Sequence, residues 1–140
     1  MAGLLLDTTV LIDVSRGFGP TVAWMARQPL TALHISSVNL AELFRGAHFA
    51  LGTAADPMAA ELLRIRTRLL PKFTGRVLNF DVAAAEIWGR LMGLGEAQGA
   101  RPPADDARIA AIALRHGLTV ATSNTHHFAR LCPTIDPRTA

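Results

Sequence analysis

Short apolar runs alternate along the chain with longer segments in which apolar positions recur every three or four residues. The short runs predict strands at 3–6, 33–36, 77–80 and 118–121, with a further edge strand at 134–135. Runs this short and this apolar are typical of strands buried on both faces of a parallel sheet.

The longer segments between these runs have the period of amphipathic helices. They predict helices at 8–15, 21–28, 40–44 with an alternative end at Gly52, 58–70, 83–98 and 106–116. Polar residues at the starts favour caps, which we expect at Thr8 and Thr9, Asn39, Asp81, and Asp105 with Asp106. Gly117 is expected to end the last of these helices in a left-handed conformation.

Strands that alternate with helices in this way predict an α/β fold with a mainly parallel sheet. The chain has 140 residues, about the size of one domain, and no repeat, low-complexity tract or linker divides it. We therefore expect residues 1–140 to form a single domain. A hydrophobic content of 50% with 18% charged residues excludes a disordered chain.

The balance of charges and the lone cysteine narrow the classes of function. The sequence pI of about 10.4 reflects the absence of Tyr and the single Lys, because almost nothing titrates between His and Arg and a net charge of only +3 persists. Cys132 is the one cysteine, which excludes a disulfide framework and a Cys-rich zinc site. Without a signal peptide or a long apolar run, we expect a soluble, cytoplasmic protein with no membrane contact.

Three acidic residues stand where a parallel sheet binds its ligands, beyond the carboxyl ends of the strands. Asp7 follows the first strand, Glu42 is expected in the first turn of the helix after the second strand, and Asp106 begins the helix before the fourth. Glu42 and Asp106 also suit helix starts on structural grounds alone. Asp7 does not, because a charge at the end of an apolar strand needs a partner.

Carboxylates that converge at such a place favour a bound cation. Two of them 4 Å apart repel by about 4 kcal/mol at an effective dielectric constant of 20, and a divalent ion removes that repulsion. Oxygen ligands favour Mg²⁺ or Mn²⁺ over zinc. Such ions serve phosphoryl chemistry by polarising a phosphate oxygen and activating water.

Four motifs occur in order along nearly the whole chain. They are LLLDTTVLID at 4–13, SSVNLAEL at 36–43, DARIAAIA at 106–113, and TVATSN at 119–124 followed by Phe128. Together they resemble the PIN-domain signature. The segment 70–81 is similar to the VapC/FitB-type branch of that family, the toxins of bacterial type II toxin–antitoxin pairs.

The resemblance implies a PIN-like three-layer sandwich, in which helices flank a short central sheet, and a metal-dependent endoribonuclease. Asp7, Glu42 and Asp106 would be its catalytic residues and would hold Mg²⁺ or Mn²⁺. Thr8 would hydrogen-bond near the metal waters, and Thr122 would support the site from the fourth strand. The resemblance further implies a homodimer and a VapB-like antitoxin through which operator DNA is bound.

The chain departs from the family pattern at two positions that are commonly acidic, Asn124 and His127. Three carboxylates remain, which suffice for one cation, and Asp105 is an alternative ligand to Asp106. Because His126 and His127 are adjacent, a poor spacing for shared ligation on a helix, a catalytic role for His127 is the less favoured interpretation. The departures leave an alternative function, a weakened PIN-like module that binds antitoxin and nucleic acid without cutting.

Basic residues gather between 64 and 76, where Arg64 and Arg68 share a helix face and Lys72 lies just beyond. One interpretation is a solvated helix face, and the other is a contact surface for RNA or antitoxin. Arg45 and Arg108, which closely follow Glu42 and Asp106, are expected to approach the substrate or to steady the acids.

Overall fold

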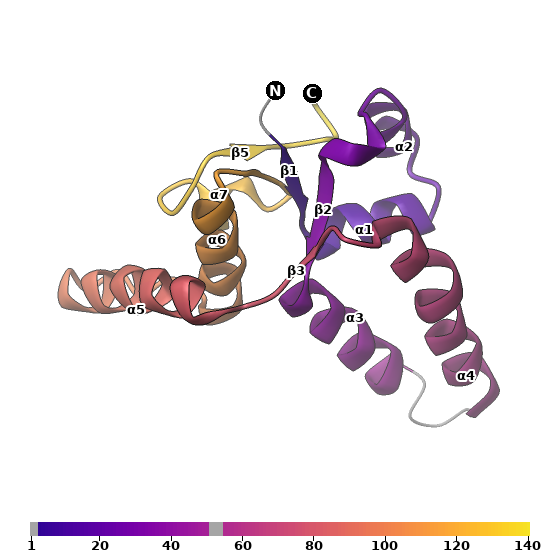
Figure 1. Cartoon of the computed structure of the whole chain (residues 1–140), viewed down its shortest axis with the longest axis horizontal. Coiled ribbons are helices and arrows are strands. Elements are labelled where there is room, and N and C mark those ends of the chain that lie inside the picture. The colour runs from indigo at the N-terminus through magenta and orange to yellow at the C-terminus, as the bar shows by residue number, and fades with distance from the viewer. Residues whose placement is uncertain (1–2, 51–54) are drawn as a thin grey trace.

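The structure is a computed structural model that describes the chain at residues 3–50 and 55–140. Its centre is a five-stranded sheet in the order β3-β2-β1-β4-β5 (Figure 1). The strands are β1 (Leu4–Leu6), β2 (Leu33–Ser36), β3 (Val77–Leu78), β4 (Thr119–Ala121) and β5 (Thr134–Ile135). Each described pairing is parallel, which confirms the predicted α/β class.

The central place of β1 decides where the site can form. The strands β2 and β3 extend the sheet on one side of β1, and β4 and β5 extend it on the other. The order of strands therefore reverses at β1, and in such sheets ligands bind beyond the carboxyl ends of the strands at that point. Asp7 is the residue that leaves β1 there.

Helices cover both faces of the sheet, as the three-layer prediction requires (Figure 1). In chain order they are α1 (Thr8–Ser15), α2 (Gly19–Ala26), α3 (Ser37–Ala50), α4 (Ala55–Arg64), α5 (Val82–Ala97), α6 (Ala104–His116) and α7 (Thr125–Phe128). A π-helical turn, Ile65–Leu69, prolongs α4, and short 3₁₀ turns cover Leu30–Ala32 and Leu70–Phe73. No helix of the described residues is both long and apolar enough to cross a membrane.

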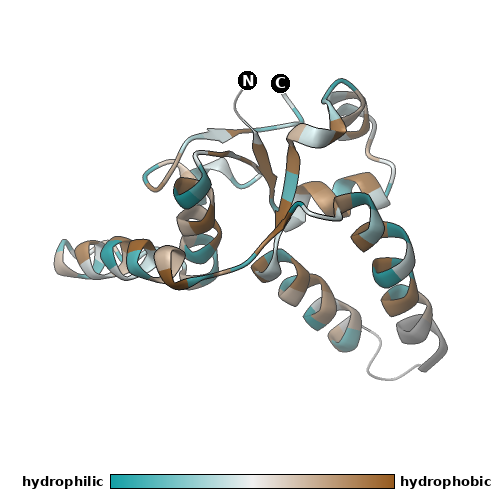
Figure 2. Cartoon of the chain, viewed as in Figure 1, coloured by the Kyte–Doolittle hydropathy of each residue, from teal (hydrophilic) through white to brown (hydrophobic). Residues whose placement is uncertain are grey.

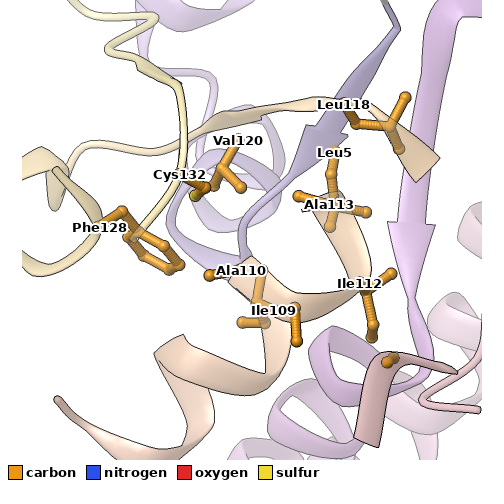
Figure 3. Packing of buried hydrophobic residues seen from close by; sticks show 11 residues of the cluster. Leu5, Ile109, Ala110, Ile112, Ala113, Leu118, Val120, Phe128 and Cys132 are labelled. Carbon is orange, nitrogen blue, oxygen red and sulfur yellow. The ribbon is translucent and has the colours of Figure 1, made fainter. Parts of the chain in front are cut away.

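Two hydrophobic clusters fill the spaces between the layers. Leu5 packs with α6 and with Phe128 on one face, and Leu6 packs with α1, α2 and β2 on the other. Figure 3 shows the first cluster, in which Ile109 and Ala110 face Leu5, Val120 and Phe128. Hydrophobic colour runs along the central strands in Figure 2, whereas hydrophilic residues are spread over α4 and α5. Leu5 and Leu6 thus lie on opposite faces of the sheet, because successive side chains of a strand point in opposite directions.

The predicted strands and most helix boundaries agree with the structure to within a few residues. The strand expected at 77–80 is confined to Val77–Leu78, and the short helix α7 is an addition to the predicted set. The third helix runs to Ala50, and its alternative end at Gly52 lies outside the described residues. Gly117 ends α6 with φ of 66°, which confirms the predicted left-handed cap.

Several of the predicted caps are wrong, and the corrections matter for the site. The cap of α3 is Ser36 rather than Asn39, because the Asn39 backbone N–H donates to Ser36 Oγ and the Ser36 N–H donates back to Asn39 Oδ1. This reciprocal pair is a capping box, and it starts the helix at Ser37. At α5 the prediction is confirmed, since Asp81 accepts a hydrogen bond from the Ala84 N–H at 2.9 Å.

The acidic and hydroxyl residues at the other two starts do not cap their helices. The cap position of α6 is Pro103, which leaves Asp105 and Asp106 within the first turn without a capping bond. The cap position of α1 is Asp7 rather than Thr8 or Thr9, and the Asp7 side chain makes no capping bond either. These side chains are therefore available for other contacts.

Candidate active site

Asp7 is buried where β1 passes into α1, with 5% of its surface exposed. Its Oδ2 atom accepts hydrogen bonds from Thr122 Oγ1 at 2.8 Å and from Thr9 Oγ1 at 3.3 Å. Burial raises the pKa of the Asp7 carboxyl, and these hydrogen bonds oppose the rise. Thr122, which directly follows the fourth strand, therefore contacts Asp7 through its hydroxyl group.

Glu42 faces the same end of the sheet from α3. Because the helix starts at Ser37, Glu42 lies in the second turn rather than in the first turn predicted from the sequence. Thr8 Oγ1 donates to Glu42 Oε1 at 3.2 Å, and Asn39 Nδ2 donates to Thr8 Oγ1 at 3.2 Å. Burial, followed by repulsion from Asp7 and from the two acids of α6, raises the pKa of Glu42 to about 7.

Asp106 completes the acidic group from the first turn of α6, with 19% of its side chain exposed. Burial and the charge of Asp7 raise its pKa, while His127 opposes this effect. His127 Nδ1 lies 3.0 Å from Asp106 Oδ2. The sequence interpretation of the histidine pair did not include this contact, whose one hint is that His127 occupies a position that is often acidic in the family.

The three carboxylates come from separate elements, and each has a raised pKa. Asp7 contributes to the rise at both Glu42 and Asp106, so the groups repel one another. Among the described residues, no three His, Cys, Asp or Glu side chains already stand together in metal-ligating geometry. The chemistry of the group nevertheless fits a hard cation, since all three donors are carboxylate oxygens and a positive charge would offset their repulsion.

Residues around Asp7 fix the end of β4 as well. The Ser123 N–H donates to Thr9 Oγ1 at 3.1 Å, and the Asn124 N–H donates to Thr122 Oγ1 at 3.0 Å. Asn124 therefore supports the site through its backbone, which holds the hydroxyl that in turn holds Asp7.

A small hollow of about 100 Å³ adjoins the acids and is lined by Val38, Ala41, Glu42, Arg45 and Asp105. Arg45 and Asp105 therefore lie beside Glu42 in this hollow. Asp105 Oδ1 accepts a hydrogen bond from Arg108 Nη1 at 2.7 Å.

A larger cleft of about 420 Å³ lies between α1, α2 and the segment from Glu61 to Phe73. Its apolar wall includes Leu11, Met25, Leu43 and Phe73, and the basic residues Arg64, Arg68 and Lys72 also line it. Arg76, at the end of the same basic stretch, is engaged differently, since its guanidinium donates to the backbone carbonyls of Leu30, Leu33 and Lys72. Within the basic stretch, Arg64, Arg68 and Lys72 thus line the cleft, whereas Arg76 binds the backbone of neighbouring segments.

Asp13, near the end of α1, is separate from the acidic group. Arg138 Nη2 and Nε contact its two carboxylate oxygens at 2.8 and 2.9 Å, and Thr21 Oγ1 donates to Oδ2 at 2.9 Å. These hydrogen bonds give Asp13 a structural role in joining α1 to α2 and to the C-terminal segment.

A family model described as the PIN domain matches residues 4–132 of the chain. This chain belongs to the PIN-domain family. The resemblance seen in the four sequence motifs is therefore confirmed.

Curated relatives match most of the chain. The plasmid stability protein StbB of Pseudomonas syringae is 36% identical over 128 residues, which cover 89% of this chain and 90% of that protein. Toxin FitB of Neisseria gonorrhoeae is 34% identical, with 89% and 90% covered. The VapC ribonuclease Y4jK of Sinorhizobium fredii is 32% identical, with 89% of each chain covered.

Solved structures have the same PIN fold. FitAcB from Neisseria gonorrhoeae matches with a TM-score of 0.86 and 32% identity, over 96% of this chain and 97% of that chain. FitAB bound to a DNA fragment has the same score and 30% identity, with 96% and 95% covered. A toxin–antitoxin complex from Klebsiella pneumoniae has a TM-score of 0.66 and 28% identity, with 96% and 98% covered.

Proposed function

We propose that this chain is a Mg²⁺- or Mn²⁺-dependent endoribonuclease, the toxin of a VapBC-type pair that acts on cytoplasmic RNA. The observation that carries the proposal is the group of Asp7, Glu42 and Asp106 in a PIN-domain chain: burial raises the pKa of all three, and the charge of Asp7 raises those of Glu42 and Asp106 further. A relative named as a VapC ribonuclease supports the reaction class.

The residues of the chain prepare the site for a cation and a phosphodiester. A bound divalent ion supplies a positive charge that polarises the phosphate and activates water. Asp7, Glu42 and Asp106 would hold it. Thr122 and Thr9 orient the Asp7 carboxylate. Thr8 orients that of Glu42, and His127 that of Asp106. Side chains that orient ligands in this way commonly change metal affinity or activity by 10- to 100-fold when removed.

The partner proposed for the toxin is a VapB-like antitoxin, through which a toxin homodimer would contact operator DNA. Related structures are a toxin–antitoxin complex and FitAB bound to DNA. The apolar cleft lined by Arg64, Arg68 and Lys72 suits a peptide with apolar and acidic side chains. We assign these three cations to the antitoxin rather than to RNA, because apolar side chains line the same cleft.

Cleavage of purified RNA tests the proposed activity. The wild-type chain should cut RNA with Mg²⁺ or Mn²⁺ and lose this activity in EDTA, and Asp106→Asn should abolish it. Glu86→Gln is a matched control, since it also neutralises an acid, on the exposed face of α5. An inactive wild-type chain beside an active control ribonuclease would overturn the proposal.

The second candidate is the weakened module that binds without cutting, which Asn124 and His127 at commonly acidic positions favour. Calorimetric titration with Mn²⁺ separates the two functions. Binding of the cation and of RNA without cleavage selects the weakened module, and binding with cleavage selects the ribonuclease.

A further inference from the structure

Arg108 lies beside the acidic group and is held in place by Trp88 and Asp105. Its guanidinium carbon lies 4.9 Å from the centre of the Trp88 ring, and its Nη1 atom donates to Asp105 at 2.7 Å. Trp88 Nε1 donates in turn to the Ala104 carbonyl at 3.0 Å, and the Phe80 ring packs edge-on against Trp88 at 6.4 Å. The guanidinium is thus fixed to the first turns of α6, the helix that carries Asp106.

This setting leaves Arg108 able to bind another anion. A guanidinium has five N–H donors. Among the described residues, Asp105 is the one side chain that accepts a hydrogen bond from Arg108. Its side chain is 35% exposed, so the remaining donors are open to solvent on one side. Stacking on Trp88 orients the planar fork in advance, which suits bidentate contact with a phosphate.

The negative charge of the acidic group beside Arg108 makes a cation necessary for RNA to bind there. Asp7, Glu42, Asp105 and Asp106 repel an RNA backbone, whose phosphates need cationic contacts to bind and to be positioned. Asp105 links the two features, because it pairs with Arg108 and also lines the hollow that contains Glu42.

We propose that Arg108, stacked on Trp88 and paired with Asp105, binds a backbone phosphate of the RNA strand next to the acidic cleft. The inference rests on the proposed ribonuclease function and adds to it a residue that positions the substrate. Asp105 moderates this contact, since its carboxylate competes with the phosphate for the same guanidinium.

Binding of a fluorescent single-stranded RNA, measured by anisotropy in an Asp106→Asn background without metal, tests the proposal. Arg108→Ala should weaken binding about tenfold at 0.1 M salt. It should also flatten the slope of log K against log salt by about 0.7, the value for one contact to a single strand. Asp105→Asn should change the affinity in the opposite direction, because it frees the guanidinium.

Matched variants separate a phosphate contact from general charge and from structural damage. Arg115→Ala removes the same side chain from the same helix, two turns or about 10 Å further along, and should change binding little. Trp88→Leu should weaken binding without changing the salt slope, because the charge remains but loses its orientation. Thermal melting shows whether Arg108→Ala is folded. If it is not, Arg108→Lys takes its place, because it keeps the charge and removes the planar guanidinium.

An unchanged affinity and slope in Arg108→Ala, or an equal loss in Arg115→Ala, would overturn the inference. The wild-type cleavage assay distinguishes this outcome from failure of the proposed function. If the wild type cuts RNA and Arg108→Ala binds RNA as tightly as its parent, only the phosphate contact is refuted. If the wild type does not cut RNA, the proposed ribonuclease function is refuted.

Discussion

Thr122 Oγ1 donates a 2.8 Å hydrogen bond to Asp7 Oδ2 across 115 residues of sequence. The contact joins the carboxyl ends of the neighbouring strands β1 and β4, and both residues are buried. Thr122 also accepts from the Asn124 N–H, so its hydroxyl hydrogen is directed towards Asp7. Of the two hydroxyl groups that donate to the buried carboxylate, Thr122 makes the shorter hydrogen bond, and Thr9 the longer one at 3.3 Å.

Replacing Thr122 with valine keeps the shape of the side chain and removes that donor. We expect the affinity for Mn²⁺ at pH 7 to fall at least tenfold, because Asp7 loses the hydrogen bond that favours its ionised form. Calorimetric titration measures this change. Thr119→Val on the same strand is the control, and equal affinities in the two variants would contradict the role assigned to Thr122.

The raised pKa of Glu42 predicts that the metal-free protein becomes less stable as the pH rises. Its pKa is about 7 in the folded chain against 4.5 for a free glutamate, so the folded state binds the proton more tightly. The free energy of unfolding should therefore fall between pH 4.5 and 7 and stay low above that range. Discounted for the half-exposed side chain, the effect is about 1–2 kcal/mol.

Urea denaturation in EDTA at pH 5.5 and pH 8 measures this dependence. Glu42→Gln should stabilise the protein at pH 8 and reduce the difference between the two conditions. A glutamine variant with the wild-type pH profile would show that Glu42 is not the group responsible.

Metal ions should stabilise the folded chain through the same carboxylates. An ion present at 100 times its dissociation constant stabilises the folded state by about 2.7 kcal/mol when the unfolded chain does not bind it. We expect Mn²⁺ to raise the melting temperature of the wild type and to leave that of Asp7→Asn nearly unchanged. An equal rise in both proteins would place the ion elsewhere.

The Arg138–Asp13 pair should contribute to stability without affecting catalysis. Hydrogen bonds from Arg138, and secondarily from Thr21, lower the pKa of Asp13 against the opposing effect of burial. This contribution is present above pH 3.8 and is lost as the pH falls through the lowered pKa. Arg138→Ala, which leaves the Asp13 carboxylate with Thr21 alone, should lower the free energy of unfolding.

Denaturation curves at pH 7 measure the loss, with Arg115→Ala as the control on an exposed helix end. The specific activity of the folded Arg138→Ala protein should equal that of the wild type. Reduced activity at full folding would instead connect this pair to the cleft.

The thiol of Cys132 should be unreactive in the folded protein. Burial in the cluster with Phe128 and Val120 raises its pKa to about 12, so little reactive thiolate is present at pH 8. Ellman's reagent should label it slowly in buffer and fully in guanidinium chloride. Rapid labelling in buffer would contradict the packing shown in Figure 3.

The sheet and its helices could be predicted because each depends on a local pattern. Leu4–Leu6 is apolar without interruption, and Asp81 caps the helix that begins directly after it. Capping was harder to predict at Ser36 and Asn39, because both residue types favour cap positions and the choice depends on where β2 ends. The error moved Glu42 from the second turn of α3 to the first.

Contacts between distant parts of the chain could not be predicted from the sequence. His127 approaches Asp106 because Phe128 is buried in the cluster that also holds α6 and so fixes α7 against that helix. The pairing of Asp13 with Arg138 spans 125 residues and depends on where the chain passes after β5. Sequence motifs could identify the three acids, but their hydrogen-bonding partners depend on the packed fold.

The strand order has a consequence for how the proposed toxin comes into being during synthesis. Residues up to β3 supply Asp7 and Glu42, whereas Asp106 and Thr122 come from the part of the chain after α5. The first hundred residues therefore contain two of the three proposed metal ligands. Under the proposed function, the nascent chain should not cut RNA until α6 and β4 have been synthesised and β4 pairs with β1.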